Sequence, residues 1–429
     1  MSAAKRGDLP ALRTAIADRE RLANLSNRDA ADLAKVIAVR EVRSPAKPGD
    51  AIERVHDVST CAYEVDGALD DRMRTHDDAG ADAALARLDS HKLESDDVRT
   101  YAGDANPHWR AVGARAMTRV EDRLTRQHLM QDATPRVRRE AVRAATRARD
   151  AADFPILADV ARLDPEPIVR TEAVRALATQ PANPEIADRL RDLWVSGDEL
   201  LREDIALAWA APEIYANGGR DALRVIIASS KDGAGVLEAA AAVEMAWQGD
   251  AELEQAASAR IVRAIESGPV ATRLHAIAVA RLDRDKDALV AIQKAKADGD
   301  KEVEVAALSR LAGMGVVSER TDAIAALEVI AGQARLRAWK NAQGVSEGDP
   351  GSRKVGARAL FVLAQLGDLR VQQWLEEDLA SKDAYDRLAA ASALAALDRS
   401  ARAAPLLADD DAMVRSRAAC TLMLAVRGK

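Results

Sequence analysis

The sequence predicts an all-α protein, a right-handed α-solenoid of about ten stacked helical pairs with an atypical helical N-terminal region. Three observations lead to this prediction. The chain has 429 residues, too many for one ordinary core. Hydrophobic residues make up 48% of it but aromatic residues only 3%, so helices can pack closely, whereas sandwiches and barrels depend on aromatic and β-branched side chains. The third observation is a motif that recurs along the chain.

The recurring motif is clearest in two copies, which run from Asp164 to Leu177 and from Asp409 to Leu422. Both copies place Asp, Val, Arg, Ala and Leu at the same offsets. The interval between successive arginine positions is 28 to 36 residues, except for one of 49, and suits a helix–turn–helix unit. The arginine position of the motif falls at Arg110, Arg138, Arg170, Arg202, Glu238, Arg273, Glu304, Arg353, Arg387 and Arg415.

The spacing within one copy explains why it forms a helix that needs a neighbour. Val169, Ala173, Val174 and Leu177 form one apolar stripe on a 3.6-residue helix. Asp164 with the following proline is typical of a helix start. A small residue at the Ala173 position, glycine in the first copy, indicates close contact with a neighbouring helix. Each unit therefore buries its apolar face only by stacking on the next.

This motif resembles the HEAT repeat, in particular the short HEAT-like repeats of phycobilin lyases and many bacterial proteins. The resemblance covers about residues 104–424 and rests on the motif described above. It implies a polar ladder along the inner turns, formed by the Asp and Arg of successive repeats, as represented here by Asp164 and Arg170. Glu238 and Glu304 stand at arginine positions, which implies that the ladder is interrupted there.

The N-terminal region follows the motif poorly. We expect helices at about residues 8–16, 27–42 and 50–73. We therefore divide the chain into a helical N-terminal cap region, 1–103, which covers the first repeat, and a repeat array, 104–429; the alternative is a separate functional domain at 1–103. The long interval contains a polar, glycine-rich insertion at about 332–351, interpreted as a loop.

The cysteines and the first residues indicate the compartment. Cys61 and Cys420 are the two cysteines of the chain, and their wide separation favours reduced, buried thiols. The first residues lack the apolar stretch of a signal peptide, and no apolar run reaches membrane length. We expect a cytoplasmic protein; a leader upstream of Met1 would instead make it periplasmic or lipid-anchored. The sequence does not predict its oligomeric state.

The sequence offers no recognisable catalytic, cofactor or metal site. It contains no His-Glu dipeptide, which the HEAT-type deoxyhypusine hydroxylases repeat to bind iron, and none of its six histidines stands in a metal-binding motif. It also lacks a nucleophile elbow and a phosphate-binding loop. We therefore expect a protein that is not an enzyme and needs no cofactor.

One segment is strongly basic although the whole chain carries a net charge of −7. Residues 110–149 hold eleven arginines and four acidic residues, a local charge of +7. This segment raises three interpretations: a salt-bridged surface, a dock for an acidic protein, or a nucleic-acid site like that of HEAT-like DNA glycosylases.

The function that we expect from the sequence is a non-catalytic scaffold that binds a protein partner on the concave face of the solenoid. Its alternatives are a nucleic-acid-binding or glycosylase-like protein that uses residues 110–149, and a lyase-like enzyme that acts on a protein-bound chromophore. Trp339 is the tryptophan that we expect to be exposed beside arginines, as in binding hot spots. The candidate partner-binding residues are Arg110, Arg138, Arg139, Arg143, Arg170, Arg202 and Trp339.

Overall fold

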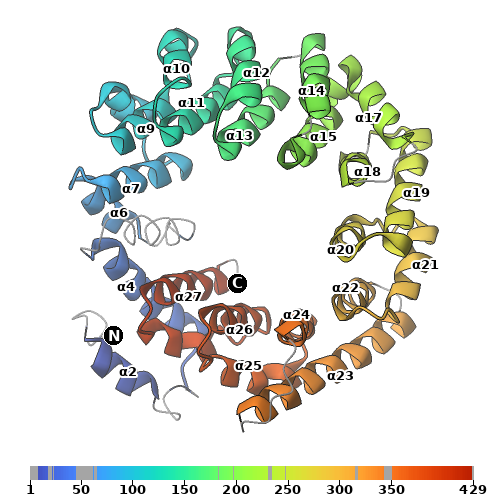
Figure 1. The fold of residues 1–429 in the computed structure, drawn as a ribbon. Coiled ribbons are helices and arrows are strands. Elements are labelled where there is room, and N and C mark those ends of the chain that lie inside the picture. The colour runs from blue at the N-terminus through green and yellow to red at the C-terminus, as the bar shows by residue number, and fades with distance from the viewer. Residues whose placement is uncertain are drawn as a thin grey trace. The chain divides into compact units, whose positions relative to one another are not determined.

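The computed structural model describes residues 8–17, 22, 24–44, 61, 65–181, 183–196, 198–229, 234–246, 248–314, 317–342 and 350–427. Helices dominate these residues, and no strand occurs among them (Figure 1). The predicted all-α solenoid class is confirmed. The chain forms two compact units: one comprises residues 94–310, and the other joins residues 1–93 to residues 311–429.

The unit of residues 94–310 is an array of helical pairs in which one helix of each pair lies in an inner row and the other in an outer row (Figure 1). The inner row is α9 (Pro107–Ala116), α11 (Pro135–Ala148), α13 (Pro167–Ala178), α15 (Arg202–Ala210), α18 (Ala234–Ala246) and α20 (Val270–Val279). The outer row is α10 (Arg123–Leu129), α12 (Phe154–Leu163), α14 (Pro184–Ser196), α17 (Arg220–Ile227), α19 (Ala251–Ser267) and α21 (Lys286–Ala295).

Short helices connect these rows and begin the array. They are α8 (Ser95–Val98), η2 (Arg99–Gly103), η3 (Val120–Asp122), η4 (Ala151–Asp153), η5 (Glu199–Leu201), α16 (Pro212–Ile214) and the π-helical turn η6 (Tyr215–Gly219). Helix α22 (Lys301–Ala312) follows α21. Consecutive inner helices pack side by side, as do α19 and α21 of the outer row.

The apolar stripe predicted for one repeat is the core of α13. Val169, Ala173, Val174 and Leu177 have no exposed surface. Asp164 differs from its predicted role, because α13 begins after Glu166, and the Asp164 carboxylate accepts a hydrogen bond from the Glu166 amide at 2.9 Å in the preceding turn.

The small-residue position is as tight as its sequence indicates. Gly113 of α9 lies against η2, and a Cβ atom added to it would come within 2.0 Å of the backbone nitrogen of Ala102. Backbone cannot move away from such a contact as a flexible side chain can, so α9 and η2 require glycine at this position.

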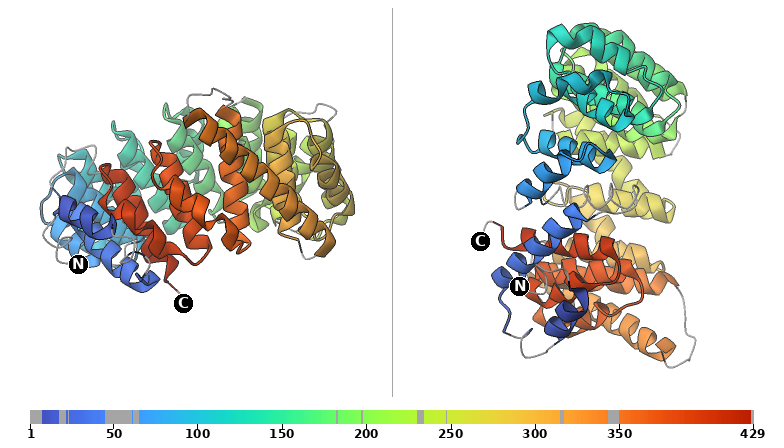
Figure 2. Two further views of the ribbon diagram at one scale, coloured as in Figure 1. Left: turned by 90° about the horizontal axis from the view of Figure 1, so that it is seen from below. Right: turned by 90° about the vertical axis from the view of Figure 1, so that its left-hand side faces the viewer.

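The second unit brings the two ends of the sequence together (Figure 2). Its N-terminal helices are α2 (Leu9–Ala17), α4 (Asn27–Arg43), α6 (Asp66–Met73) and α7 (Asp78–Asp89). Its C-terminal helices are α23 (Val317–Ala342), α24 (Pro350–Gln365), η7 (Leu369–Val371), α25 (Gln372–Asp378), α26 (Ala384–Ala396), η8 (Ser400–Ala408) and α27 (Ala412–Ala425). Helix α4 packs against α27 and η8, and α2 packs against η8.

This packing corrects the prediction for the part of residues 1–103 that forms α2 and α4. The expected helices at 8–16 and 27–42 are present as α2 and α4, and Ser26 caps α4 by accepting from the Asp29 amide at 3.1 Å. Helix α4, however, packs on the last repeat, whereas the sequence predicted a cap on the first. The physical reason is an apolar face on α4, including Ala34 and Ile37, which is fully buried and fits the face of α27 that a further repeat would cover.

The region predicted to be an inserted loop, residues 332–351, also differs from its prediction. Residues 332–342 belong to helix α23, and Pro350 begins α24. Both ends of the expected loop are therefore helical. Its centre, residues 343–349, and most of the helix expected at 50–73 lie outside the described residues.

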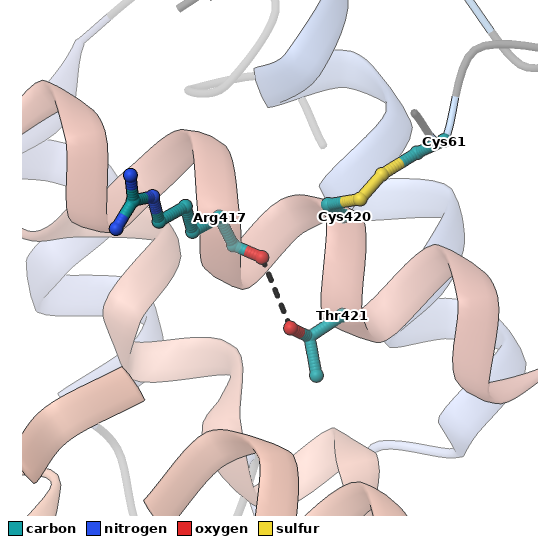
Figure 3. Close-up of a disulfide and its surroundings, with 4 residues drawn as sticks. All are labelled: Cys61, Arg417, Cys420 and Thr421. Carbon is teal, nitrogen blue, oxygen red and sulfur yellow. Dashed lines mark hydrogen bonds between the residues drawn. A yellow bond between two sulfur atoms is a disulfide. The ribbon is translucent and has the colours of Figure 1, made fainter. Parts of the chain in front are cut away.

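A disulfide joins Cys61 to Cys420, which lies on α27 (Figure 3). The two Cα atoms are 5.4 Å apart, and the two residues are 359 positions apart in sequence. The expectation of two reduced thiols is therefore wrong. Sequence separation hides this pairing because the last helix of the chain meets the N-terminal region in one compact unit.

Candidate partner-binding face on the inner helices

A ladder of ion pairs connects the turns of successive repeats. Arg138 donates from Nε and Nη2 to the two carboxylate oxygens of Asp164 at 2.7 and 2.8 Å, and from Nη1 to the Asp132 carbonyl oxygen at 2.9 Å. Arg138 thus binds the turn of its own repeat and the aspartate of the next. We call this set of pairs the turn ladder; its other members are Arg110 with Asp132, Arg170 with Asp198, Arg273 with Asp298, and Arg387 with Asp409.

The turn ladder perturbs the ionisation of its members. The hydrogen bond to Asp164 raises the pKa of Arg138. Burial raises the pKa of Asp132, but hydrogen bonds from Arg110 and from the Thr134 backbone outweigh burial and hold that pKa below its ordinary value. These are charge-assisted contacts that fix the angle between repeats.

Three motif positions differ from the ladder pattern among the described residues. Arg202, where the sequence indicates no gap, pairs with Glu199 of its own turn at 3.2 Å. Glu238 lies 3.5 Å from His275 Nε2, and Glu304 pairs with Lys301. The interruption expected at Glu238 and Glu304 is thus present in the structure.

A second ladder, which we did not expect from the sequence, runs across the inner helices. Arg115 of α9 donates to Glu140 of α11 at 3.0 Å. Arg143 of α11 donates to Glu172 of α13 at 2.7 and 2.9 Å. We call this set, completed by Arg175 of α13 and Asp204 of α15 at 2.6 Å, the inner-face ladder. The signal in the sequence is a Glu-x-x-Arg spacing at 140–143 and again at 172–175.

The inner-face ladder is partly open to solvent. The side chains of Arg143 and Arg175 are 29% and 59% exposed, and that of the neighbouring Arg139 is 31% exposed. Their carboxylate partners are less exposed: 13% for Glu172 and 10% for Asp204. Burial raises the pKa of Glu172, but the hydrogen bond and charge of Arg143 lower it below the ordinary value. The ladder therefore fixes cationic side chains on this face and leaves part of each one accessible.

The predicted partner-binding residues fall into three groups. Arg110, Arg138 and Arg170 are components of the turn ladder, and Arg202 pairs within its own turn. Arg139 and Arg143 lie on the inner helices, where both contact Glu172. The side chain of Trp339, in α23, lies outside those that the structure describes.

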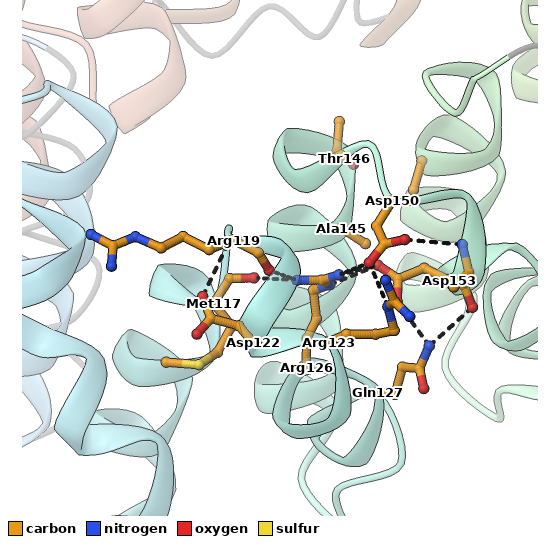
Figure 4. A network of polar contacts seen from close by, with 12 residues as sticks. Met117, Arg119, Asp122, Arg123, Arg126, Gln127, Ala145, Thr146, Asp150 and Asp153 are labelled. Atoms are coloured by element: carbon orange, nitrogen blue, oxygen red, sulfur yellow. Dashed lines mark hydrogen bonds and ion pairs between the residues drawn. The ribbon is translucent and has the colours of Figure 1, made fainter.

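The basic segment 110–149 is neutralised by residues mostly outside it. Arg126 of α10 has no exposed surface, and it donates to Asp153 at 2.7 Å and to the carbonyl oxygens of Met117 and Arg119 (Figure 4). The carboxylate of Asp150 accepts from Arg123 at 2.6 Å. Other arginines of the segment pair with Asp96, Asp164, Glu172 and Glu213. The local charge of +7 is thus balanced largely by neighbouring turns and repeats, which removes the main argument for a nucleic-acid surface.

A shallow depression of about 530 Å³ lies on the outer side of the turn ladder. Asp164 and Arg138 contribute to its lining, together with apolar residues of α12 that include Ile156, Val160 and Leu163. Leu163 is 64% exposed at its rim.

Neither a metal-binding cluster nor a membrane-spanning helix occurs among the described residues. No three side chains of His, Cys, Asp or Glu gather there in an arrangement that would hold a metal ion. None of the described helices combines the length and the apolar character needed to cross a bilayer.

Comparison with known proteins assigns residues 95–178 to the HEAT repeats. This match confirms the HEAT resemblance over the stretch where both ladders are best formed. No curated protein sequence matches the chain.

Several solved structures resemble the chain. Human deoxyhypusine hydroxylase in complex with glycerol shares 17% identity, with 71% of this chain and 95% of that chain covered and a TM-score of 0.25. Kap121p bound to Nup53p shares 13% identity, with 92% and 49% covered and a TM-score of 0.32. A triple mutant of Kap121p shares 14% identity with the same coverage and a TM-score of 0.33. The chain thus spans about half the length of Kap121p.

Proposed function

We propose that this protein is a non-catalytic scaffold that binds a protein partner on the inner helices of residues 94–310. The observation that carries the proposal is the inner-face ladder, which holds Arg143 and Arg175 in place and leaves both partly exposed, with the partly exposed Arg139 beside Glu172. An arginine whose side chain is already ordered loses less conformational entropy when it binds, so each new hydrogen bond contributes more to affinity.

The chemistry of the face favours an acidic partner segment. Guanidinium groups bind carboxylates with two parallel hydrogen bonds, and arginine is enriched among the residues that dominate binding energy. The inner helices also expose apolar side chains, among them Ile168 of α13 at 50% and Met245 of α18 at 63%. Apolar contacts beside fixed charges are the usual composition of a protein interface.

The test uses a variant that weakens the face but keeps the ladder. Arg139 is a suitable target because its contact with Glu172 is 3.4 Å long, and Glu172 keeps its closer partner Arg143. Arg147 is an exposed residue of the same helix. We combine Arg139→Gln with Arg147→Gln, and as a matched control combine Arg162→Gln with Arg191→Gln on outer helices α12 and α14, where both arginines are about half exposed.

The measurement is affinity capture from native lysate with quantitative mass spectrometry, followed by titration of the purified partner against each variant. We expect the inner variant to weaken binding about tenfold or more and the outer variant to bind like the wild type. Equal binding by both variants, with thermal unfolding unchanged, would place the interface elsewhere. An enzymatic turnover of the captured protein would contradict the non-catalytic assignment.

A further inference from the structure

The disulfide is placed where it controls one contact of the fold. Cys61 is 1% exposed, and Cys420 is partly exposed on α27. The bond ties residues that follow α4 to the helix against which α4 packs. It therefore reinforces the docking of the N-terminal helices on the last repeat.

Non-covalent contacts hold the same docking surface. Arg415 of α27 donates to Glu41 of α4 at 2.9 Å, and both side chains are at most 10% exposed. The Asn27 amide group donates to Asp398, and its oxygen accepts from the Ala401 amide at 3.0 Å. Because these contacts do not depend on the sulfur atoms, α4 can remain docked when the bond is broken, but it then opens more often.

From this placement we propose that Cys61–Cys420 is a redox-controlled clamp: the oxidised pair holds the N-terminal helices on α27, and reduction allows them to open reversibly. Helix α4 would then expose the apolar face that carries Ala34 and Ile37, and α27 would expose the face that α4 covers. The proposal concerns this unit alone and is independent of the partner-binding face on residues 94–310.

The chemistry of the clamp is thiol–disulfide exchange with a low-molecular-weight disulfide or a dithiol oxidoreductase. For closure, the Cys420 thiolate attacks the disulfide of the reactant and releases one thiolate. The Cys61 thiolate then attacks the Cys420 sulfur of the mixed disulfide and releases the second, so two electrons pass to the reactant. For opening, a reactant thiolate attacks the sulfur of Cys420, the more exposed residue of the pair, and Cys61 leaves as a thiolate that takes up a proton. A second reactant thiolate then attacks the reactant sulfur of the mixed disulfide and releases the Cys420 thiolate, so two electrons pass to the protein.

This assignment bears on the compartment. Disulfides persist where thiols are not continuously reduced, such as the bacterial periplasm or the extracellular space. A formed Cys61–Cys420 disulfide would indicate that the protein resides in such a compartment, and transfer to a reducing compartment would break the bond.

The experiment compares the full-length protein after treatment with oxidised glutathione and after treatment with dithiothreitol. Thiol counting with a maleimide under denaturing conditions should find none per chain in the first sample and two in the second. Hydrogen–deuterium exchange should then be faster in the reduced sample, by about tenfold or more, across α4 and α27. Helices α11 and α13 serve as internal controls and should exchange equally in both samples.

A double variant, Cys61→Ser with Cys420→Ser, separates the redox effect from reagent effects. It should exchange like the reduced wild type in both treatments. The proposal is overturned if oxidised glutathione leaves two free thiols or links two chains instead of one. It is also overturned if α4 and α27 exchange equally in the oxidised and reduced wild type.

Discussion

Arg415 of α27 contacts Glu41 of α4 in the way that Arg138 contacts Asp164 of the next repeat. Arg415 Nη1 also donates to the carbonyl oxygens of Asp409 and Asp410, as the ladder arginines do within their own turns. Glu41 therefore replaces the ladder aspartate that a further repeat would supply, and α4 occupies the place of that repeat.

Removal of the Glu41 carboxylate should leave Arg415 buried without its ionic partner. We expect Glu41→Ala to lower the free energy of unfolding by about 3 kcal/mol, since breaking one half of a buried pair costs far more than breaking an exposed one. Urea unfolding of the reduced protein measures the change without the contribution of the disulfide. The matched control is Asp32→Ala on the exposed side of the same helix, which should change stability by less than about 0.5 kcal/mol. A loss no larger than that of the control would mean that Glu41 is not a ladder position.

At Gly113, the small-residue position of the first repeat, we expect one added methyl group to lower the free energy of unfolding strongly. Gly113→Ala should destabilise the protein by about 2–3 kcal/mol, because the new Cβ atom meets the backbone of η2 and α9 must move. Gly299→Ala is the control, since nothing lies within 4 Å of a Cβ atom there. Thermal unfolding of the two variants should separate them clearly; similar melting temperatures would show that η2 yields easily.

The buried cation of α10 predicts a third effect. Arg126→Met should lower the free energy of unfolding by about 3–5 kcal/mol, because Asp153, which has no exposed surface, would lose its charged partner. Adding Asp153→Leu removes the second charge as well, and we expect the double variant to recover part of the loss. If the double variant loses as much stability as the two single variants added together, Arg126 and Asp153 do not interact energetically.

The repeat pattern could be predicted from the sequence because it depends on local spacing. The stripe through Val169, Ala173 and Leu177 and the contact at Gly113 both follow from residues within one helical pair. The turn ladder followed from the resemblance to HEAT repeats, and its gap at Glu238 was visible as a change of residue.

Of the three interpretations of residues 110–149, the ion pairs support the salt-bridged surface, and a local charge count could not select it for a physical reason. A solenoid places partners about one repeat apart, so a count within a sequence window separates Arg143 from Glu172 and Arg126 from Asp153. The docking of α4 and the disulfide could not be predicted for a related reason. Local patterns identify an apolar face on α4, but they do not indicate which of many similar repeat faces it covers.

Glu244 predicts a pH dependence of stability opposite in sign to that of the ladder carboxylates. The pKa values of Asp132 and Glu172 are lowered in the folded protein, whereas that of Glu244 is raised. Burial raises the pKa of Glu244, with a further contribution from the charge of Asp285. Its carboxylate therefore opposes folding at neutral pH, and this cost disappears as the pH falls through the raised pKa of the folded state. Glu244→Gln should raise the melting temperature at about pH 7, and the gain should shrink toward about pH 4, where the unfolded chain also binds the proton.

Melting curves of wild type and Glu244→Gln across this range measure the dependence. The exposed Glu252, at 85%, supplies the control variant Glu252→Gln. A gain that persists at acidic pH would show that the amide stabilises the site by its hydrogen bonds and not by its lack of charge.

The pairing of α4 with α27 also has a consequence for biosynthesis. Glu41 and Arg415 are 374 residues apart, so the contact cannot form until the ribosome has synthesised the long stretch between them. At about 5–20 residues per second, the apolar face of α4 waits about 20–75 s for its partner helix. During that time this face is open to chaperones, proteases and neighbouring nascent chains.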